Sequence, residues 1–171
     1  MAGIVTSASS KMKQKVGDGQ CTRLVAYALT EAGKKTTRDF DVVGNTADYV
    51  WGTVVASDSS PTLDAVLPGD IIQFRNHVIT VKTTGSPPAP SILPGERKHH
   101  SAVIANKGWR QDDYGRMYYE FSIIEQNYAG KKYVVKSKVL LQPKADLDFG
   151  SGNEILIQST GKYWIYRPVN K

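Results

Sequence analysis

Hydrophobic residues recur at helical spacing near the start of the chain. Between Leu24 and Leu29 the apolar positions lie three or four residues apart, the interval that places side chains on one face of an α-helix. Asp18, in the glycine-rich turn before this run, is a candidate N-cap, and Gly33 is a typical C-terminal stop. The pattern predicts a helix that begins at Cys21 and ends before Gly33.

The remainder of the chain has the short period of β-strands. β-Branched and aromatic residues fall in brief runs that are separated by Gly, Pro, Asn and Asp. The strand-like runs are 48–55, 71–75, 78–82, 99–105, 117–124, 133–141, 154–158 (alternatively a helical turn) and 161–168. We expect five to seven mostly antiparallel strands with the helix packed on them, an α+β fold.

Two segments are predicted to interrupt the sheet. Asn76 and His77 are expected to form the turn of a hairpin between 71–75 and 78–82, with His77 at the surface. Segment 85–95 contains four prolines, which exclude a helix or a central strand and predict an exposed loop.

Length and charge limit the classes of function. The 171 residues are expected to form one domain over 16–171, preceded by a flexible segment, 1–15. The net charge of +6 is dispersed, so we expect no specific nucleic-acid partner. No apolar run reaches the roughly 20 residues of a membrane span, and no signal peptide is recognisable. We expect a monomer that is cytoplasmic, exported without a cleaved signal, or excised from a longer chain.

Cys21 is the only cysteine, which excludes an internal disulfide and any cysteine-cluster zinc site. A thiol in the first turn of a helix lies near the positive end of the helix dipole, which favours the nucleophilic thiolate. The alternative is that Cys21 is a small buried hydrophobe, as many free cysteines are.

The partners of a catalytic thiol are available at strand ends. A cysteine hydrolase needs an imidazole within reach of the thiolate and a polar group that orients the imidazole. His99 and His100 open one predicted strand, and Glu125 and Asn127 close another. Because strand side chains alternate, only one histidine can face the site, and we favour His100, in phase with buried Ala102 and Ile104. The alternatives are solvated histidines and turn-capping roles for Glu125 and Asn127.

A metal or cofactor site is less well supported. Cys21, His99, His100 and Glu125 are ligand types, but adjacent histidines on a strand diverge. No His-Glu-x-x-His motif, phosphate-binding loop or dinucleotide fingerprint is present. We therefore expect no metal and no cofactor. Asp70, after Pro-Gly, is expected to cap backbone amides of its own turn.

Four motifs in order resemble the CHAP family, the cysteine- and histidine-dependent amidohydrolases/peptidases of the papain-like and NlpC-like superfamily. They are Gly-Asp-Gly-Gln-Cys at 17–21, Leu-Pro-Gly-Asp-Ile-Ile-Gln-Phe at 67–74, His-Ser-Ala-Val-Ile at 100–104 and Ile-Glu-Gln-Asn at 124–127. A closer resemblance is to CHAP-like domains at the ends of some eukaryotic cytoskeletal and proline-rich proteins, which share Asp-Tyr-Val-Trp-Gly at 48–52 and the double histidine.

The resemblance implies a papain-like hydrolase with Cys21 as nucleophile and His100 as general base. Glu125 would orient the imidazole, assisted or replaced by Asn127. The further residues that it implies near the oxyanion or substrate are Gln20, His99 and Trp51, although Trp51 is also a core or cleft-wall candidate.

CHAP enzymes hydrolyse amides through an acyl-thioester, commonly in peptidoglycan peptides, so a peptide or peptidoglycan-type substrate is expected. The proline-rich insertion before the histidines and the absence of wall-binding repeats depart from wall-lytic enzymes. The alternative function is a CHAP-like binding or scaffold module that has lost turnover.

Overall fold

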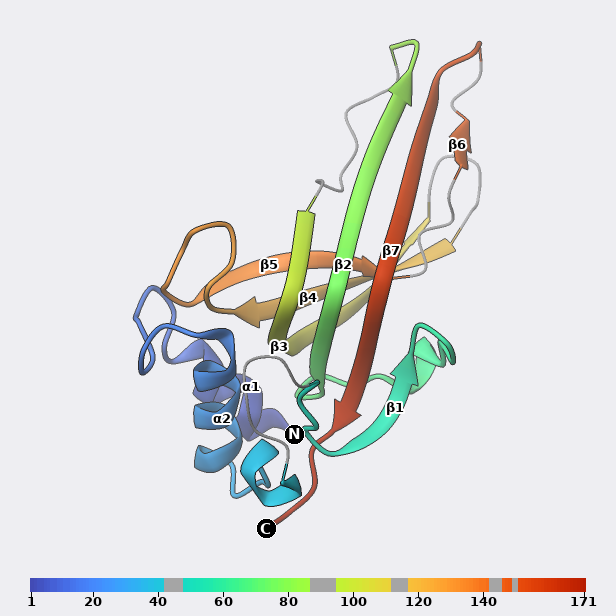
Figure 1. The fold of residues 1–171 in the computed structure, drawn as a ribbon. Helices are drawn as coiled ribbons and strands as arrows, with labels where there is room; N and C mark the ends of the chain where they lie inside the picture. The colour runs from blue at the N-terminus through green and yellow to red at the C-terminus, as the bar shows by residue number, and fades with distance from the viewer. Residues whose placement is uncertain (42–47, 87–94, 112–116, 142–145, 149–150) are drawn as a thin grey trace.

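The computed structural model describes residues 1–41, 48–86, 95–111, 117–141, 146–148 and 151–171 (Figure 1). The helices are α1 (Ala2–Ser9) and α2 (Cys21–Glu31), with short 3₁₀ turns η1 (Thr37–Phe40) and η2 (Leu63–Ala65). The strands are β1 (Thr53–Ser57), β2 (Ile71–Thr84), β3 (Gly95–Gln111), β4 (Met117–Glu125), β5 (Val135–Leu141), β6 (Asp146–Asp148) and β7 (Glu154–Arg167).

The strands form one antiparallel sheet in the order β1-β7-β2-β3-β4-β5, and β6 pairs with β7. The two α-helices lie together beside this sheet. The upper parts of β2 and β7 extend well beyond their neighbours β1 and β3 (Figure 1). The predicted α+β fold with an antiparallel sheet is confirmed.

The helix predicted from periodicity is α2. Its buried positions are those of the apolar repeat: Cys21, Leu24, Val25, Ala28 and Leu29. Gly33, two residues beyond the helix, has φ +66°, the left-handed conformation in which a glycine ends a helix without strain.

The first fifteen residues, predicted to be a flexible segment, instead contain α1. Ile4 and Ala8 of this helix are fully buried against α2 and the sheet. The composition of 1–15 is polar, but two apolar residues four positions apart are enough to bury one face of a short helix.

The predicted hairpin at 76–77 is wrong, because Ile71–Thr84 is one continuous strand. Its pairing with β7 shifts between Arg75 and Val78, where Asn76 has φ +50°. Gly161 lies opposite, and a Cβ there would come within 2.0 Å of the Asn76 carbonyl oxygen. The break predicted at 76–77 and the gap predicted between 158 and 161 therefore lie opposite each other and form a β-bulge. As a result, the predicted strands 154–158 and 161–168 are one strand, β7.

The prediction that His77 lies at the surface is also wrong. Its side chain is 1% exposed, with Nε2 2.9 Å from the Ser159 hydroxyl. The rings of Phe74 and Tyr163 lie beside it, at centroid distances of 5.0 and 6.4 Å. The bulge keeps His77 within the sheet instead of placing it at a turn.

Two other predictions differ at their boundaries. The strand expected at 48–55 begins only at Thr53, and Tyr49 and Trp51 before it are buried in the core. Most of the predicted loop 85–95 lies outside the described residues, and its last residue, Gly95, begins β3.

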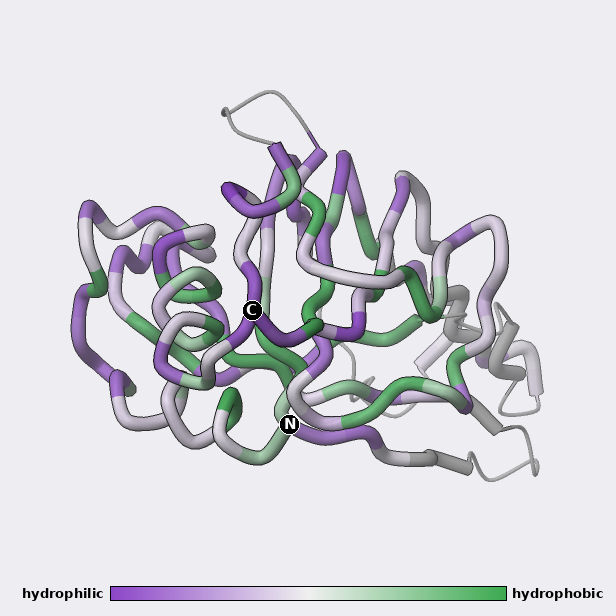
Figure 2. The backbone as a smooth tube through the Cα atoms, turned by 90° about the horizontal axis from the view of Figure 1, so that it is seen from below, coloured by the Kyte–Doolittle hydropathy of each residue, from purple (hydrophilic) through white to green (hydrophobic). Residues whose placement is uncertain are grey.

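The core has two parts. One cluster joins α1 and α2 to the sheet through residues such as Leu24, Ile71 and Val103, and the other gathers Phe74, Phe121 and their neighbours. Hydrophobic segments (green) run along the helices and the strands, while hydrophilic ones (purple) are common in the outer turns (Figure 2). Within the described ranges, no helix has both the length and the apolarity to cross a membrane.

Candidate active site

Cys21 is the first residue of α2, and its side chain is 6% exposed. The N-cap is Gln20, in an extended conformation, and not Asp18. The Asp18 carboxylate accepts the Gln20 N–H at 3.0 Å and so stabilises the turn that precedes the helix. The thiol therefore lies at the positive end of an eleven-residue helix.

His100 lies between Cys21 and Glu125. It comes from β3, is 5% exposed, and its Nε2 is 2.8 Å from Oε2 of Glu125. The Cys21 thiol lies beside the imidazole, since each of the two groups shifts the pKa of the other. Thiol, imidazole and carboxylate thus form a continuous chain of contacts, the arrangement of a cysteine hydrolase.

Glu125, the last residue of β4, has no exposed surface. Besides His100 it contacts Arg97, whose Nε and Nη2 donate to the two carboxylate oxygens at 3.1 and 2.9 Å. The Ser137 hydroxyl donates to Oε1 as well. Burial raises the pKa of Glu125, but its contacts with His100 and Arg97 outweigh burial and lower the pKa to about 2.

Electrostatics in the site favour a charged pair. Burial raises the pKa of the Cys21 thiol, yet the hydrogen bond and charge of His100 bring it below its ordinary value. Burial lowers the pKa of His100, but contacts with Cys21 and Glu125 raise it to about 9. A thiolate–imidazolium pair is therefore the expected form between these two pKa values, which belong to the pair as a whole.

Three polar residues of the site were not predicted from the sequence. Arg97 is 3% exposed and lies over the Tyr128 ring at 4.1 Å and the Phe74 ring at 5.3 Å. Gln126 has no exposed surface, and Ser137 is half-buried. A charged residue in the polar run Gly-Glu-Arg-Lys carries no local sign of burial, so the sequence held no signal for Arg97.

Gln126 holds the segment that leads to Cys21. Its Oε1 accepts the Val16 N–H at 2.7 Å, and its Nε2 donates to the carbonyl oxygens of Val16 and Gln20 at 3.0 and 2.9 Å. The side chain after Glu125 thereby positions the backbone immediately before Cys21.

The other predicted site residues are not part of the group formed by Cys21, His100 and Glu125, which we call the triad. Asn127 is exposed, and its Nδ2 donates to Oε1 of Gln20 at 3.1 Å, so the structure brings these two together beside Cys21. Among the described residues, no contact joins Asn127 to His100. His99 faces away from the triad, stacked on Tyr49 with the ring centroids 5.0 Å apart.

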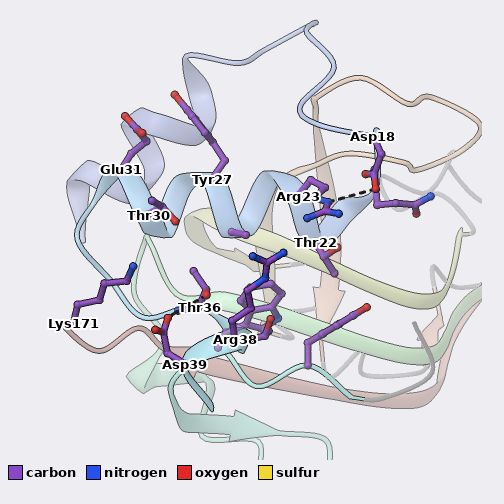
Figure 3. Close-up of a pocket in the computed structure, with 15 residues that line it drawn as sticks. Asp18, Thr22, Arg23, Tyr27, Thr30, Glu31, Thr36, Arg38, Asp39 and Lys171 are labelled. Atoms are coloured by element: carbon purple, nitrogen blue, oxygen red, sulfur yellow. Dashed lines mark hydrogen bonds and ion pairs between the residues drawn. The ribbon is translucent and has the colours of Figure 1, made fainter. Parts of the chain in front are cut away.

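Trp51 is fully buried, and its Nε1 has no hydrogen-bond partner in the described part of the chain. It lines a cavity of about 570 Å³ between α2 and η1 (Figure 3). Gln20 and Thr22, the residues on either side of Cys21, line the same cavity.

Asp70 has the capping role expected for it. Its carboxylate accepts the Leu67 N–H at 2.8 Å and forms an ion pair with Arg167 at 2.9 Å. No group of three or more His, Cys, Asp or Glu side chains within the described ranges is arranged to hold a metal ion.

Comparison with known proteins supplies a family. The model of the AIM3/BBC1 cysteine proteinase-fold domain matches residues 2–171. No curated protein and no solved structure matches the chain. The match agrees with the papain-like fold expected from the motifs, and it does not single out the CHAP or NlpC branches of that fold.

Proposed function

The chain belongs to the AIM3/BBC1 cysteine proteinase-fold domain family, and on this premise we propose that it is a thiol-dependent amidase or peptidase. The observation that carries the proposal is the buried chain of contacts from Cys21 through His100 to Glu125. A solely structural cysteine would not need an imidazole that is itself held by an ionised carboxylate.

The geometry supports a two-step hydrolysis. The Cys21 thiolate attacks the carbonyl carbon of the substrate amide, and the His100 imidazolium gives its proton to the leaving amine as the C–N bond breaks. Neutral His100 then takes a proton from water, whose oxygen attacks the thioester, and the acid product leaves as the thiolate re-forms. Glu125 stabilises the imidazolium throughout.

Two groups are suited to stabilise the oxyanion of each tetrahedral intermediate. The first N–H groups of α2 have no partner within the helix and point towards its N-terminal end. Gln20 directly precedes the nucleophile in the sequence. Its Oε1 accepts a hydrogen bond from Nδ2 of Asn127, which fixes the orientation of the Gln20 side-chain amide. We assign Gln20 to this role and Asn127 to its positioning.

The finer features of the resemblance enter only as parts of this proposal. A CHAP-like amidase accounts for the four motifs, and the substrate that we propose is a peptide amide. Peptidoglycan draws no support from the family match, which concerns the cysteine proteinase fold alone.

The test is the rate of Cys21 alkylation by iodoacetamide as a function of pH, in the wild type and in His100→Ala. We expect a fast rate at about pH 6, where a free thiol with pKa about 8.5 is almost entirely protonated. The His100→Ala variant should lose this fast phase and follow the titration of glutathione, the reference thiol.

A slow rate that rises only near the pKa of glutathione and is the same in both proteins would contradict the proposal. The family member would then be better described as a binding or scaffold module. If the fast phase is present, hydrolysis of a peptide library by the wild type, with Cys21→Ser as the control, identifies the scissile amide.

A further inference from the structure

The cavity beside the nucleophile extends along α2. Thr22 lines one end, next to Cys21, and Thr30 lines the other. At about 1.5 Å per residue these two positions are roughly 12 Å apart, the length of about four residues of extended peptide. Tyr49, which also lines the cavity, stacks on His99, whose backbone carbonyl oxygen is 4.0 Å from the Cys21 sulfur.

Most acidic groups of the cavity are already engaged. The Asp18 carboxylate accepts the Gln20 N–H and pairs with Arg23 at 3.3 Å. The Asp39 carboxylate accepts the Thr36 N–H at 2.7 Å within a capping box. Glu31 lies at the far end and points away from η1 (Figure 3).

Arg38 is a cation without such a partner. It belongs to η1, and its guanidinium reaches across the cavity towards α2 (Figure 3). Among the described residues no carboxylate forms an ion pair with it. A guanidinium offers five N–H donors and no acceptor, in a planar fork that matches a carboxylate.

Trp51 forms a buried part of the wall of the same cavity. Its side chain is fully buried, it lines the cavity, and its Nε1–H has no partner in the described part of the chain. Of the two, only the Arg38 guanidinium is open to the cavity, where a ligand group that accepts hydrogen bonds can satisfy it.

We propose that this cavity binds a carboxylate side chain of the substrate, with Arg38 as the residue that determines specificity. The inference rests on the proposed hydrolase function and names its substrate class: a peptide with Asp or Glu within about four residues of the scissile amide. The net charge of +6 favours approach of such acidic peptides.

The test uses the Cys21→Ala protein, in which no turnover can occur. Two acetylated and amidated alanine peptides are titrated into it, one with a central Glu and the other with Gln in its place. Binding is followed by the indole N–H resonance of Trp51, which reports on the cavity itself. We expect the Glu peptide to bind about tenfold more tightly, as one charge-assisted hydrogen-bonded pair provides.

Arg38→Ala, made in the same Cys21→Ala background, should bind both peptides equally, and Arg38→Lys should keep part of the preference. Lys136→Ala removes an exposed cation of β5 outside the cavity and should keep all of it. The proposal would be overturned if the Cys21→Ala protein that retains Arg38 bound the two peptides equally. It would also be overturned if the preference for the Glu peptide survived in Arg38→Ala.

A phosphoserine peptide provides the remaining comparison. If it binds and the Glu peptide does not, the cavity recognises phosphate and the assignment to a carboxylate is wrong. Because peptide binding to Cys21→Ala needs no reactive thiol, this experiment and the alkylation test fail independently of each other.

Discussion

Arg97 and Glu125 form a bidentate ion pair whose side chains are only 2% and 0% exposed. The same carboxylate contacts His100 at 2.8 Å, so one buried anion is shared by the Arg97 guanidinium and the His100 imidazole. Arg97 keeps Glu125 ionised and fixed, and Glu125 in turn keeps His100 protonated. This pair therefore couples the stability of the fold to the protonation of the site.

Replacing Arg97 by Gln should lower the free energy of unfolding by about 3–5 kcal/mol, because it removes the bidentate cation from a fully buried carboxylate. The control is Arg75→Gln at the half-exposed Arg75–Asp48 pair, where a loss below about 1 kcal/mol is expected. Urea unfolding measures both. Equal losses in the two variants would show that the buried pair has no special weight.

The thiolate–imidazolium pair should lose the imidazolium proton at a pH, its alkaline limit, that depends on Glu125. Iodoacetate is an anion that the His100 imidazolium attracts, so its reaction with Cys21 should decline as pH rises through about 9. Cys21 and Glu125 both raise the pKa of His100, so Glu125→Gln, which removes the charge of Glu125, should move the decline to lower pH. Glu125→Asp keeps the charge and should keep the limit near its original position. An unchanged limit in Glu125→Gln would mean that the carboxylate does not act on the imidazole.

Gln126 and Asn127 are adjacent but should respond differently to truncation. Gln126→Ala removes three part-buried hydrogen bonds to the backbone of Val16 and Gln20 and leaves the Val16 N–H without its partner, with an expected loss of about 1–3 kcal/mol and slower alkylation of Cys21. Asn127→Ala removes one exposed contact, and stability should stay within about 0.5 kcal/mol. Urea unfolding and the iodoacetamide rate test both. A loss of alkylation in Asn127→Ala as large as in His100→Ala would instead give Asn127 a direct role at the imidazole.

Buried His77 should make the protein acid-sensitive. Burial and the positive charge of Arg97 lower the pKa of His77 to about 4, whereas the unfolded chain takes up this proton at about 6.5. Since the unfolded state binds the proton first, stability is intact above about pH 6.5 and declines as pH falls to about 4, by about 3 kcal/mol in total. The free energy of unfolding, measured across this pH range, should decline less steeply in His77→Phe than in the wild type. The decline that is left in the variant comes from Glu125 and the other carboxylates.

The opposite sign applies to His100. Its pKa is raised to about 9, so its contribution to stability is complete below about pH 6.5 and is lost as pH rises through about 9. Acid unfolding that begins at neutral pH therefore belongs to His77, and alkaline loss belongs to His100. Comparing the His77→Phe and His100→Ala variants separates the two.

Local pattern was sufficient for the elements that depend on near neighbours. The apolar repeat placed α2 with Cys21 at its start, and Gly33 ended the helix, because side-chain periodicity and backbone freedom act within a few residues. The resemblance to CHAP domains indicated the papain-like fold, and the family match agrees with that coarser assignment. Cys21, His100 and a partner at Glu125 or Asn127 were expected from residue type, position and the resemblance, and the structure places Glu125 against His100 and Asn127 against Gln20.

Tertiary structure alone decided where polar residues are buried. Arg97 and Glu125 are 28 residues apart, and only the pairing of β3 with β4 makes the arginine the partner of a buried anion. Asn76 and Gly161 each carry a local turn signal, but their positions opposite each other turn two predicted breaks into one bulge and bury His77. The sequence records which residues are polar, whereas the free energy of burying them depends on partners that only the folded chain supplies.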